Sequence, residues 1–249
     1  MPVSKPQADG VRRMKGVHLF HFGLSSCSQR VRFALEEKGV AWEGHVVDLH
    51  KMENVSREYQ QIHPKGYVPA LVHDGRLVTE SVDIIRYIDG HFAGPSLMPE
   101  STEGVELLNH WLALADQNQR CLKTLTYELL FKKLGHFSKD EEVQYYIEHQ
   151  SNPDLVQFIK DFTAGFPEER IHGCLDEVES FLADLNGLLS ENRYVVGDHF
   201  SLADIAVVVN VHRYKLLQMN LEPYEAIRNW YQRIESRPGF QKAITAFER

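Results

Sequence analysis

A short run of hydroxyl and thiol side chains, Ser25, Ser26 and Cys27, holds the residue types in this sequence most suited to activating a nucleophile. The run follows the apolar segment 17–22 and precedes a helical pattern that ends at Gly39. Backbone N–H groups at the start of a helix are unpaired, and the helix dipole is positive there. Such a corner binds anions and favours a thiolate over a thiol. We therefore predict that it activates a thiol, either that of Cys27 or that of a bound ligand.

Two strands and a helix are expected to position this corner. Residues 17–22 and 43–48 have the apolar character of strands, and the pattern between them is helical. We predict that Ser26 caps this helix and that Gln29 reaches back to complete a capping box. Strand, helix and strand in this order form a βαβ unit, whose two strands run parallel.

A hairpin and a second helix come next in the chain. Asp74-Gly75 is a strong turn signal between the apolar segments 70–72 and 77–79, which we predict to pair antiparallel. A helix then begins at Glu80. A βαβ unit followed by two strands and a helix is a thioredoxin-like plan with a mixed four-stranded sheet.

The rest of the sequence predicts a second, all-helical domain. Apolar residues recur at helical spacing from residue 105 to residue 249, which we assign to this domain. Residues 94–104 contain Gly, Pro and Ser without an apolar period, so we predict a linker there. The thioredoxin-like domain then covers 17–93, and the charged, Pro- and Gly-containing residues 1–16 are predicted to be a flexible tail.

Composition and charge exclude several classes of function. The chain has 249 residues, 43% of them hydrophobic, and a formal net charge of -8. This charge argues against binding to nucleic acid or to an acidic membrane surface. No early apolar segment has the pattern of a signal peptide and no apolar run is long enough to span a bilayer, so we predict a cytoplasmic protein. The cysteines Cys27, Cys121 and Cys174 show no disulfide or zinc spacing, and the 13 histidines are scattered, so we predict no metal site. Cys121 and Cys174 are expected in the core.

Three separated motifs carry a resemblance to one family: Val68-Pro69, Glu80-Ser81 and Ser201-x-x-Asp204. In this order, between a small α/β module and a helical half, they resemble the soluble glutathione transferase family. The resemblance covers nearly the whole chain after residue 16. It implies a thioredoxin-like domain followed by an all-helical domain, glutathione as co-substrate, and a homodimer.

The resemblance also implies where glutathione would bind. In the family the proline of the first motif is cis, and X–Pro is the bond that most easily adopts this form. The backbone of Val68, next to Pro69, would pair with the cysteinyl part of glutathione like an added strand. Glu80 and Ser81, at a helix N-terminus, would hold the γ-glutamyl end. Two neighbouring residues are predicted at the glycine end: Lys65 and Tyr67.

Three residues compete for the catalytic role within the corner. Ser25 would donate a hydrogen bond to the glutathione sulfur and favour its thiolate, or it is only a turn residue. Ser26 has a chemical role or only starts the helix. Cys27 would attack a glutathione conjugate by thiol–disulfide exchange, or it packs as a small hydrophobe. Arg30 and Arg32 face solvent or pair with acids such as Glu36, or Arg30 instead steers an anionic substrate.

The subclass is divided between two resemblances. The run from Ser25 to Arg32 is similar to zeta-class isomerases and to tetrachlorohydroquinone reductive dehalogenases. The segment 132–166 and Gly165-Phe166-Pro167 resemble bacterial β-etherases, which split aryl ethers with glutathione. We therefore expect glutathione to attack an apolar or aromatic electrophile. An aryl ether is favoured, and a dehalogenase or isomerase using Cys27 is the alternative. A non-catalytic glutathione-binding module is the remaining alternative.

The helical half should supply the pocket for this electrophile. Aromatic residues at helical spacing can form such a pocket, although they more often belong to a core. The predicted lining residues are Trp111, Tyr127, Phe131, Phe162 and Tyr214.

Overall fold

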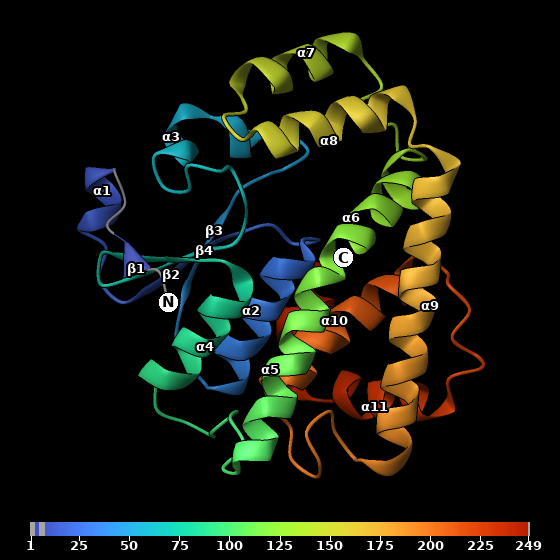
Figure 1. The fold of residues 1–249 in the computed structure, drawn as a ribbon. Helices are drawn as coiled ribbons and strands as arrows, with labels where there is room; N and C mark the ends of the chain where they lie inside the picture. The colour runs from blue at the N-terminus through green and yellow to red at the C-terminus, as the bar shows by residue number, and fades with distance from the viewer. Residues whose placement is uncertain (1–2, 5–7, 249) are drawn as a thin grey trace.

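The computed structural model describes residues 3–4 and 8–248, which form a sheet-containing half and a helical half (Figure 1). The strands are β1 (Val3–Ser4), β2 (Val17–His21), β3 (Glu43–Val46), β4 (Ala70–His73) and β5 (Arg76–Thr79). Their order in the sheet is β1-β5-β4-β2-β3. Strands β2 and β3 are parallel, and every other neighbouring pair is antiparallel. The four predicted strands thus form the mixed sheet of a thioredoxin-like plan.

The helices of the sheet-containing half cover both faces of the sheet. They are α1 (Asp9–Arg12), α2 (Ser26–Glu37), η1 (Glu53–Val55), α3 (Arg57–Gln60) and α4 (Ser81–His91). Helices α2 and α4 pack against each other, and α2 also contacts α10 and α12 of the helical half. One continuous apolar core therefore runs from β2 through α2 into the helical half.

The described part of the helical half follows without strands. Its elements are α5 (Thr102–Gln117), α6 (Gln119–Thr126), the π-helical turn η2 (Tyr127–Phe131), α7 (Asp140–His149), α8 (Pro153–Ala164), α9 (Glu168–Glu191), α10 (Leu202–Leu216), α11 (Glu225–Glu235), α12 (Pro238–Ala243) and η3 (Thr245–Phe247). Among the described residues no helix is long and apolar enough to cross a bilayer.

Helix α10 is buried along nearly its whole length, and a buried carboxylate fixes its start. The motif Ser201-x-x-Asp204 forms a capping box, in which Asp204 accepts hydrogen bonds from the backbone and hydroxyl of Ser201 at 2.9 and 3.0 Å. The other oxygen of Asp204 accepts from Trp230 Nε1 at 2.9 Å and from the Val195 amide at 3.0 Å. Burial raises the pKa of Asp204, while these four donors act in the opposite direction.

The segment 1–16, predicted as a flexible tail, contains regular structure within its described residues. Val3–Ser4 pairs with β5 as an edge strand, and Val11 of α1 is buried beside Phe20. The tail prediction missed this because the open edge of a sheet offers unpaired backbone groups that a preceding segment can satisfy. The contact is close at the hairpin, where a Cβ on Gly75 would collide with the Arg12 carbonyl.

Candidate active site

A cavity of about 630 Å³ lies between the start of α2 and the helices α6, η2 and α8. Ser25, Ser26 and Cys27 line it on the side of the α/β half, together with Tyr67 and Val68. Aromatic and charged side chains of the helical half line the opposite side. The volume is in the range of small-molecule sites. The structure therefore brings the predicted thiol-activating corner to the wall of a ligand-sized space.

The helix cap at this corner is Ser25 and not Ser26, which corrects the predicted capping box. Ser25 Oγ accepts a hydrogen bond from the backbone N–H of Ser28 at 3.2 Å. A hydroxyl that accepts a bond at its oxygen still carries a proton that it can donate. The Ser25 hydroxyl thus retains a donor at the positive end of α2, on the wall of the cavity.

Ser26 and Cys27 both direct their protons at one amide of the helical half. Ser26 Oγ donates to Gln119 Oε1 at 2.8 Å, and Cys27 Sγ lies 3.8 Å from the same oxygen. Gln119 Nε2 in turn donates to Asn210 Oδ1 at 2.6 Å. The Ser26 hydroxyl proton is therefore committed to the protein, whereas that of Ser25 is not. Gln119 was missed from the sequence because only the fold brings α6 against α2.

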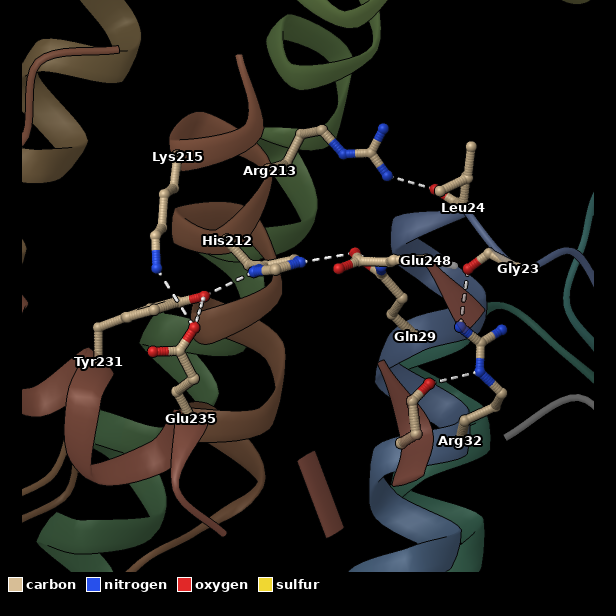
Figure 2. Close-up of polar contacts among 11 residues, drawn as sticks. Gly23, Leu24, Gln29, Arg32, His212, Arg213, Lys215, Tyr231, Glu235 and Glu248 are labelled. Atoms are coloured by element: carbon tan, nitrogen blue, oxygen red, sulfur yellow. Dashed lines mark hydrogen bonds and ion pairs between the residues drawn. The ribbon is translucent and has the colours of Figure 1, made fainter. Parts of the chain in front are cut away.

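Two buried arginines hold the loop before Ser25 in place. Arg32 donates to the carbonyls of Gly23 and Phe22 at 2.8 and 3.1 Å. Arg213 of α10 donates to the carbonyl of Leu24, and Figure 2 shows both guanidinium groups directed at this loop. Carbonyls that are held by charged donors move little, because such hydrogen bonds are the stronger kind. The loop thus fixes the position of the Ser25 side chain.

The end of the chain supports the same loop. Glu248 accepts hydrogen bonds from Gln29 Nε2 at 3.1 Å and from His212 Nε2 at 2.6 Å (Figure 2). The Arg32 guanidinium lies 4.2 Å from the centre of the Phe247 ring. Gln29, predicted to reach back to the helix start, instead ties α2 to the end of the chain.

The Val68-Pro69 peptide bond is cis, as the resemblance implied. Tyr67 and Val68 line the cavity, and the hydroxyl of Tyr59 donates to the Tyr67 carbonyl at 2.5 Å. Among the described residues, no hydrogen bond uses the backbone N–H or carbonyl of Val68. This backbone is thus free to pair with an extended ligand.

The predicted γ-glutamyl site lies at the start of α4. Glu80 has a positive φ of 67°, which is rare for a side-chain-bearing residue and typical of strained functional positions. Its Oε1 is 3.4 Å from Lys65 Nζ, and both side chains are exposed. Ser81 follows as the first residue of the helix and is buried. These residues and Pro69 do not line the cavity itself.

Arg30 is a buried structural link that neither faces solvent nor lines the cavity, and the acid beside it is Asp116 rather than Glu36. Its side chain is 0% exposed and absent from the cavity wall. It donates to the Ala115 carbonyl at 2.7 Å, to Asn210 Oδ1 at 3.1 Å and to Ser81 Oγ at 3.3 Å. Asp116 is 3.5 Å away and largely exposed. Hydrogen bonds therefore connect Ser26, through Gln119, Asn210 and Arg30, to Ser81.

The acceptor wall includes only some of the predicted aromatic residues. Tyr127 and Phe131, one π-helical turn apart, line the cavity with ring centres 5.0 Å from each other. Trp111 and Tyr214 were predicted there, but they are 4% and 0% exposed and belong to the main core. Phe162 is likewise buried behind the wall. Helical spacing alone does not say which neighbour a face meets, so the pattern could not separate these positions.

Other residues of the cavity had no signal in the sequence. Lys123 and Phe158 stand on the acceptor wall, with Lys123 Nζ 3.7 Å from the centre of the Phe158 ring. His50 and His136 stack at the cavity with ring centres 4.3 Å apart, and their Nδ1 atoms are 3.4 Å apart. Cys121 and Cys174 are buried in the core, as predicted.

One cluster outside the cavity has metal-ligand character, although the sequence predicted no metal site. His18, Glu43 and His45 place one ligand atom each within 4.8 Å of the others, the single such group among the described residues. The parallel register of β2 and β3, which only the fold reveals, pairs His18 with Glu43. His18 Nδ1 and His45 Nε2 are hydrogen-bonded to each other at 3.0 Å.

Comparisons with known proteins agree with this geometry. The N-terminal domain model of glutathione S-transferases matches residues 19–96, and the C-terminal domain model matches residues 168–233. Protein LigF of Sphingobium sp. is 31% identical over 93% of this chain and 94% of its own length. The chain belongs to the glutathione transferase family.

Solved and curated relatives place this transferase among several subclasses. The crystal structure of β-etherase LigF covers 92% of this chain and 98% of its own, with a TM-score of 0.85 and 28% identity. Glutathione S-transferase Z2 of Arabidopsis thaliana is 25% identical over 91% of this chain and 89% of its own length. The tetrachloro-p-hydroquinone reductive dehalogenase of Sphingobium chlorophenolicum is 24% identical over 92% and 96%. The relatives thus include a β-etherase as well as a zeta-class transferase and a reductive dehalogenase, the groups that the sequence resembles.

Proposed function

We propose that this glutathione transferase activates bound glutathione at Ser25 and uses its thiolate to cleave an aryl ether in the cavity. The observation that carries the proposal is the Ser25 hydroxyl. Its oxygen accepts from the Ser28 amide, and no hydrogen bond among the described residues uses its proton, which lies at the positive end of α2. A hydrogen bond from this donor favours the thiolate, which is the nucleophilic form.

Glutathione binding along the α/β half follows from the backbone left open beside the cavity. The free Val68 backbone would pair with the cysteinyl part. Glu80 and Ser81 would take the charged γ-glutamyl end, and Lys65 and Tyr67 the glycine end. The sequence motifs and the open Val68 backbone support the cysteinyl and γ-glutamyl contacts. Lys65 Nζ lies 3.4 Å from Glu80 Oε1, so for the glycine end the geometry favours Tyr67, which lines the cavity, over Lys65.

An aryl ether is favoured as electrophile on two grounds. Tyr127, Phe131 and Phe158 give the acceptor wall an aromatic surface that suits a flat apolar ring. β-Etherase LigF is similar over nearly the whole chain in both sequence and fold. In the reaction the thiolate forms a C–S bond, the C–O bond breaks, and its electron pair leaves with the aryl oxygen.

Product analysis tests this proposal. The protein is incubated with glutathione and an α-aryloxy ketone, and the products are identified by mass spectrometry. We expect a glutathione thioether and a phenol in equal amounts, with the rate strongly reduced in Ser25→Ala and little changed in Ser26→Ala. Turnover of haloaromatics with no thioether from any ether would overturn the ether assignment. Binding of glutathione in calorimetry without turnover of any electrophile would favour the non-catalytic glutathione-binding module.

Cys27 supports a second candidate, a glutathione-dependent reductive dehalogenase or isomerase. Its sulfur lines the cavity, two residues from Ser25, so it could attack a glutathione conjugate and release a reduced product. Reductive dehalogenation by this route requires a protein–glutathione disulfide, which mass spectrometry detects. Isomerisation requires no disulfide, because the thiolate adds to the substrate and is eliminated again. Full turnover of haloaromatics and of maleylacetoacetate by Cys27→Ala would exclude this candidate.

Three broader expectations remain proposals of the same kind. The family supports a homodimer, and the cysteine usage supports a cytoplasmic location. The break between α4, which ends at His91, and α5, which begins at Thr102, supports a division of the chain near the predicted bounds 17–93, 94–104 and 105–249, with the linker ending before Thr102. Size-exclusion chromatography with light scattering measures the first of these directly.

A further inference from the structure

Lys123 is a half-buried cation on the acceptor wall that lacks a carboxylate partner. It projects from α6 into the cavity, and the ring of Phe158 lies 3.7 Å from its Nζ. The ring of Tyr127 is farther, at 6.0 Å. No ion pair or hydrogen bond among the described residues uses this ammonium group. The face of the Phe158 ring attracts this cation but offers no acceptor for its protons, so these protons stay available to a ligand in the cavity.

The groups around Lys123 leave it able to gain and lose a proton. Burial lowers the pKa of Lys123 to about 7, and the nearby Arg170 acts in the same direction. Asp154 of α8 and Cys27 of α2 act in the opposite direction. Arg170 itself is paired with Asp161, 2.9 Å away. Near neutral pH the ammonium group therefore exchanges its proton readily.

We propose that Lys123 donates a proton to the aryl oxygen that leaves when glutathione attacks the ether carbon. This inference rests on the proposed ether cleavage. The thiolate electron pair forms the C–S bond, and the C–O bond breaks with its pair on oxygen. The proton moves from Lys123 Nζ to that oxygen. The products are a glutathione thioether, a neutral phenol and a neutral amine, which water reprotonates.

Other titratable groups of the cavity are less suited to this step. Burial raises the pKa of Tyr127, so its hydroxyl holds its proton too tightly. His136 faces His50, and burial lowers its pKa, so it is neutral and tied to its neighbour. An arginine does not release its proton near neutral pH. Lys123 lines the same cavity as the corner of α2 that would hold the sulfur, one helical turn after Gln119, which contacts Ser26 and Cys27.

The leaving oxygen defines the class of substrate that needs this residue. A phenol without electron-withdrawing groups has a pKa near that of tyrosine, about 10, and departs poorly as an anion. A nitrophenol is far more acidic and leaves without a proton donor. The site is therefore adapted to ethers of alkyl- or methoxy-substituted phenols rather than to substrates that release halide.

Rates with two matched ethers test the proposal. One α-aryloxy ketone releases 4-nitrophenol and the other, of the same skeleton, releases 2-methoxyphenol. In Lys123→Met we expect kcat with the methoxyphenyl ether to fall about 100-fold, the scale of general acid catalysis, and kcat with the nitrophenyl ether to fall less than about threefold. Lys123→Arg keeps the charge without a transferable proton, so we expect the same selective loss.

Controls separate the step from folding and from the proposed function. Lys132→Met removes an exposed lysine paired with Glu128 outside the cavity wall and should change neither rate. Calorimetry should show unchanged glutathione affinity in Lys123→Met. Equal losses of kcat with both ethers in Lys123→Met would overturn proton donation by Lys123. A wild-type rate with the methoxyphenyl ether in Lys123→Arg would do the same. Neither result would contradict ether cleavage itself. If the wild type forms no thioether from either ether, the proposed function fails, and this inference fails with it.

Discussion

The two walls of the cavity are built on different physical principles. The wall at the start of α2 is fixed by hydrogen bonds, with the loop before Ser25 held by Arg32 and Arg213. The wall of the helical half consists of ring contacts, such as those of Tyr127 with Phe131 and Phe158, around the unpaired cation of Lys123. The first wall suits one ligand in one pose, and the second suits a class of aromatic ligands. This difference predicts how each wall responds to substitution.

The largest expected effect is a loss of folding stability when the buried hydrogen bonds behind the α2 wall are removed. Arg30→Met leaves the buried acceptors on Ala115, Asn210 and Ser81 without their donor. We expect the free energy of unfolding to fall by about 3 kcal/mol, since each unsatisfied buried acceptor is costly. Urea unfolding measures it. Arg57→Met, at an exposed position, is the control and should change stability by less than about 0.5 kcal/mol. Equal stability of the two variants would contradict the proposed link.

The next effect separates Ser25 from Ser26 in activity. Ser25→Ala removes the free donor, and we expect kcat/KM to fall about 100-fold, the usual consequence of removing one donor to a developing or existing anion. The factor should be the same for every electrophile, because the sulfur is common to all. Steady-state rates across an electrophile panel measure this. A larger loss of kcat/KM in Ser26→Ala than in Ser25→Ala would show that Ser26, and not Ser25, activates the thiol.

The aromatic wall should show a smaller and more selective response. Tyr127→Leu removes ring contacts with Phe131 and Phe158. We expect KM for an aromatic electrophile to rise about tenfold, which corresponds to about 1.4 kcal/mol. The glutathione affinity should stay constant, because the other wall binds it. Tyr145→Leu, at an exposed position on α7, is the matched control. A loss of glutathione affinity in Tyr127→Leu would show that the walls are not independent.

The pH dependence should differ between the walls as well. The pKa of Lys123 is lowered to about 7, so Lys123 is protonated below that pH and loses its proton above it. With the methoxyphenyl ether we expect kcat to decline as pH rises above about 7. The nitrophenyl ether should show no such decline, because it needs no proton from Lys123. Identical pH profiles for the two ethers would remove Lys123 from the account.

The sequence predicted the first wall far better than the second. Two predicted residues, Ser25 and Val68, line the cavity, because helix starts and X–Pro bonds impose local patterns. Gln119 and Lys123 belong to a helix whose partner is set by tertiary packing, so no local pattern marks them. The same limit explains the misplaced Trp111, since an apolar helix face has the same spacing in a core and in a pocket.

Two other differences between the sequence predictions and the structure concern the helix cap and Arg30. Two adjacent serines could both cap α2, and only the backbone conformation of Ser25 decided between them. Arg30 carries a charge that usually faces solvent, yet acceptors from α4, α5 and α10 converge on it. Convergence of three helices cannot be read from one segment of sequence.

Titration of the bound thiol tests the central claim most directly. The ultraviolet absorbance of the thiolate is followed against pH for glutathione bound to the wild type, Ser25→Ala and Ser26→Ala. We predict a thiol pKa in the wild type and in Ser26→Ala below the free value of about 8.5, and a value at least about one unit higher in Ser25→Ala. The same thiol pKa in the wild type and Ser25→Ala would contradict the account.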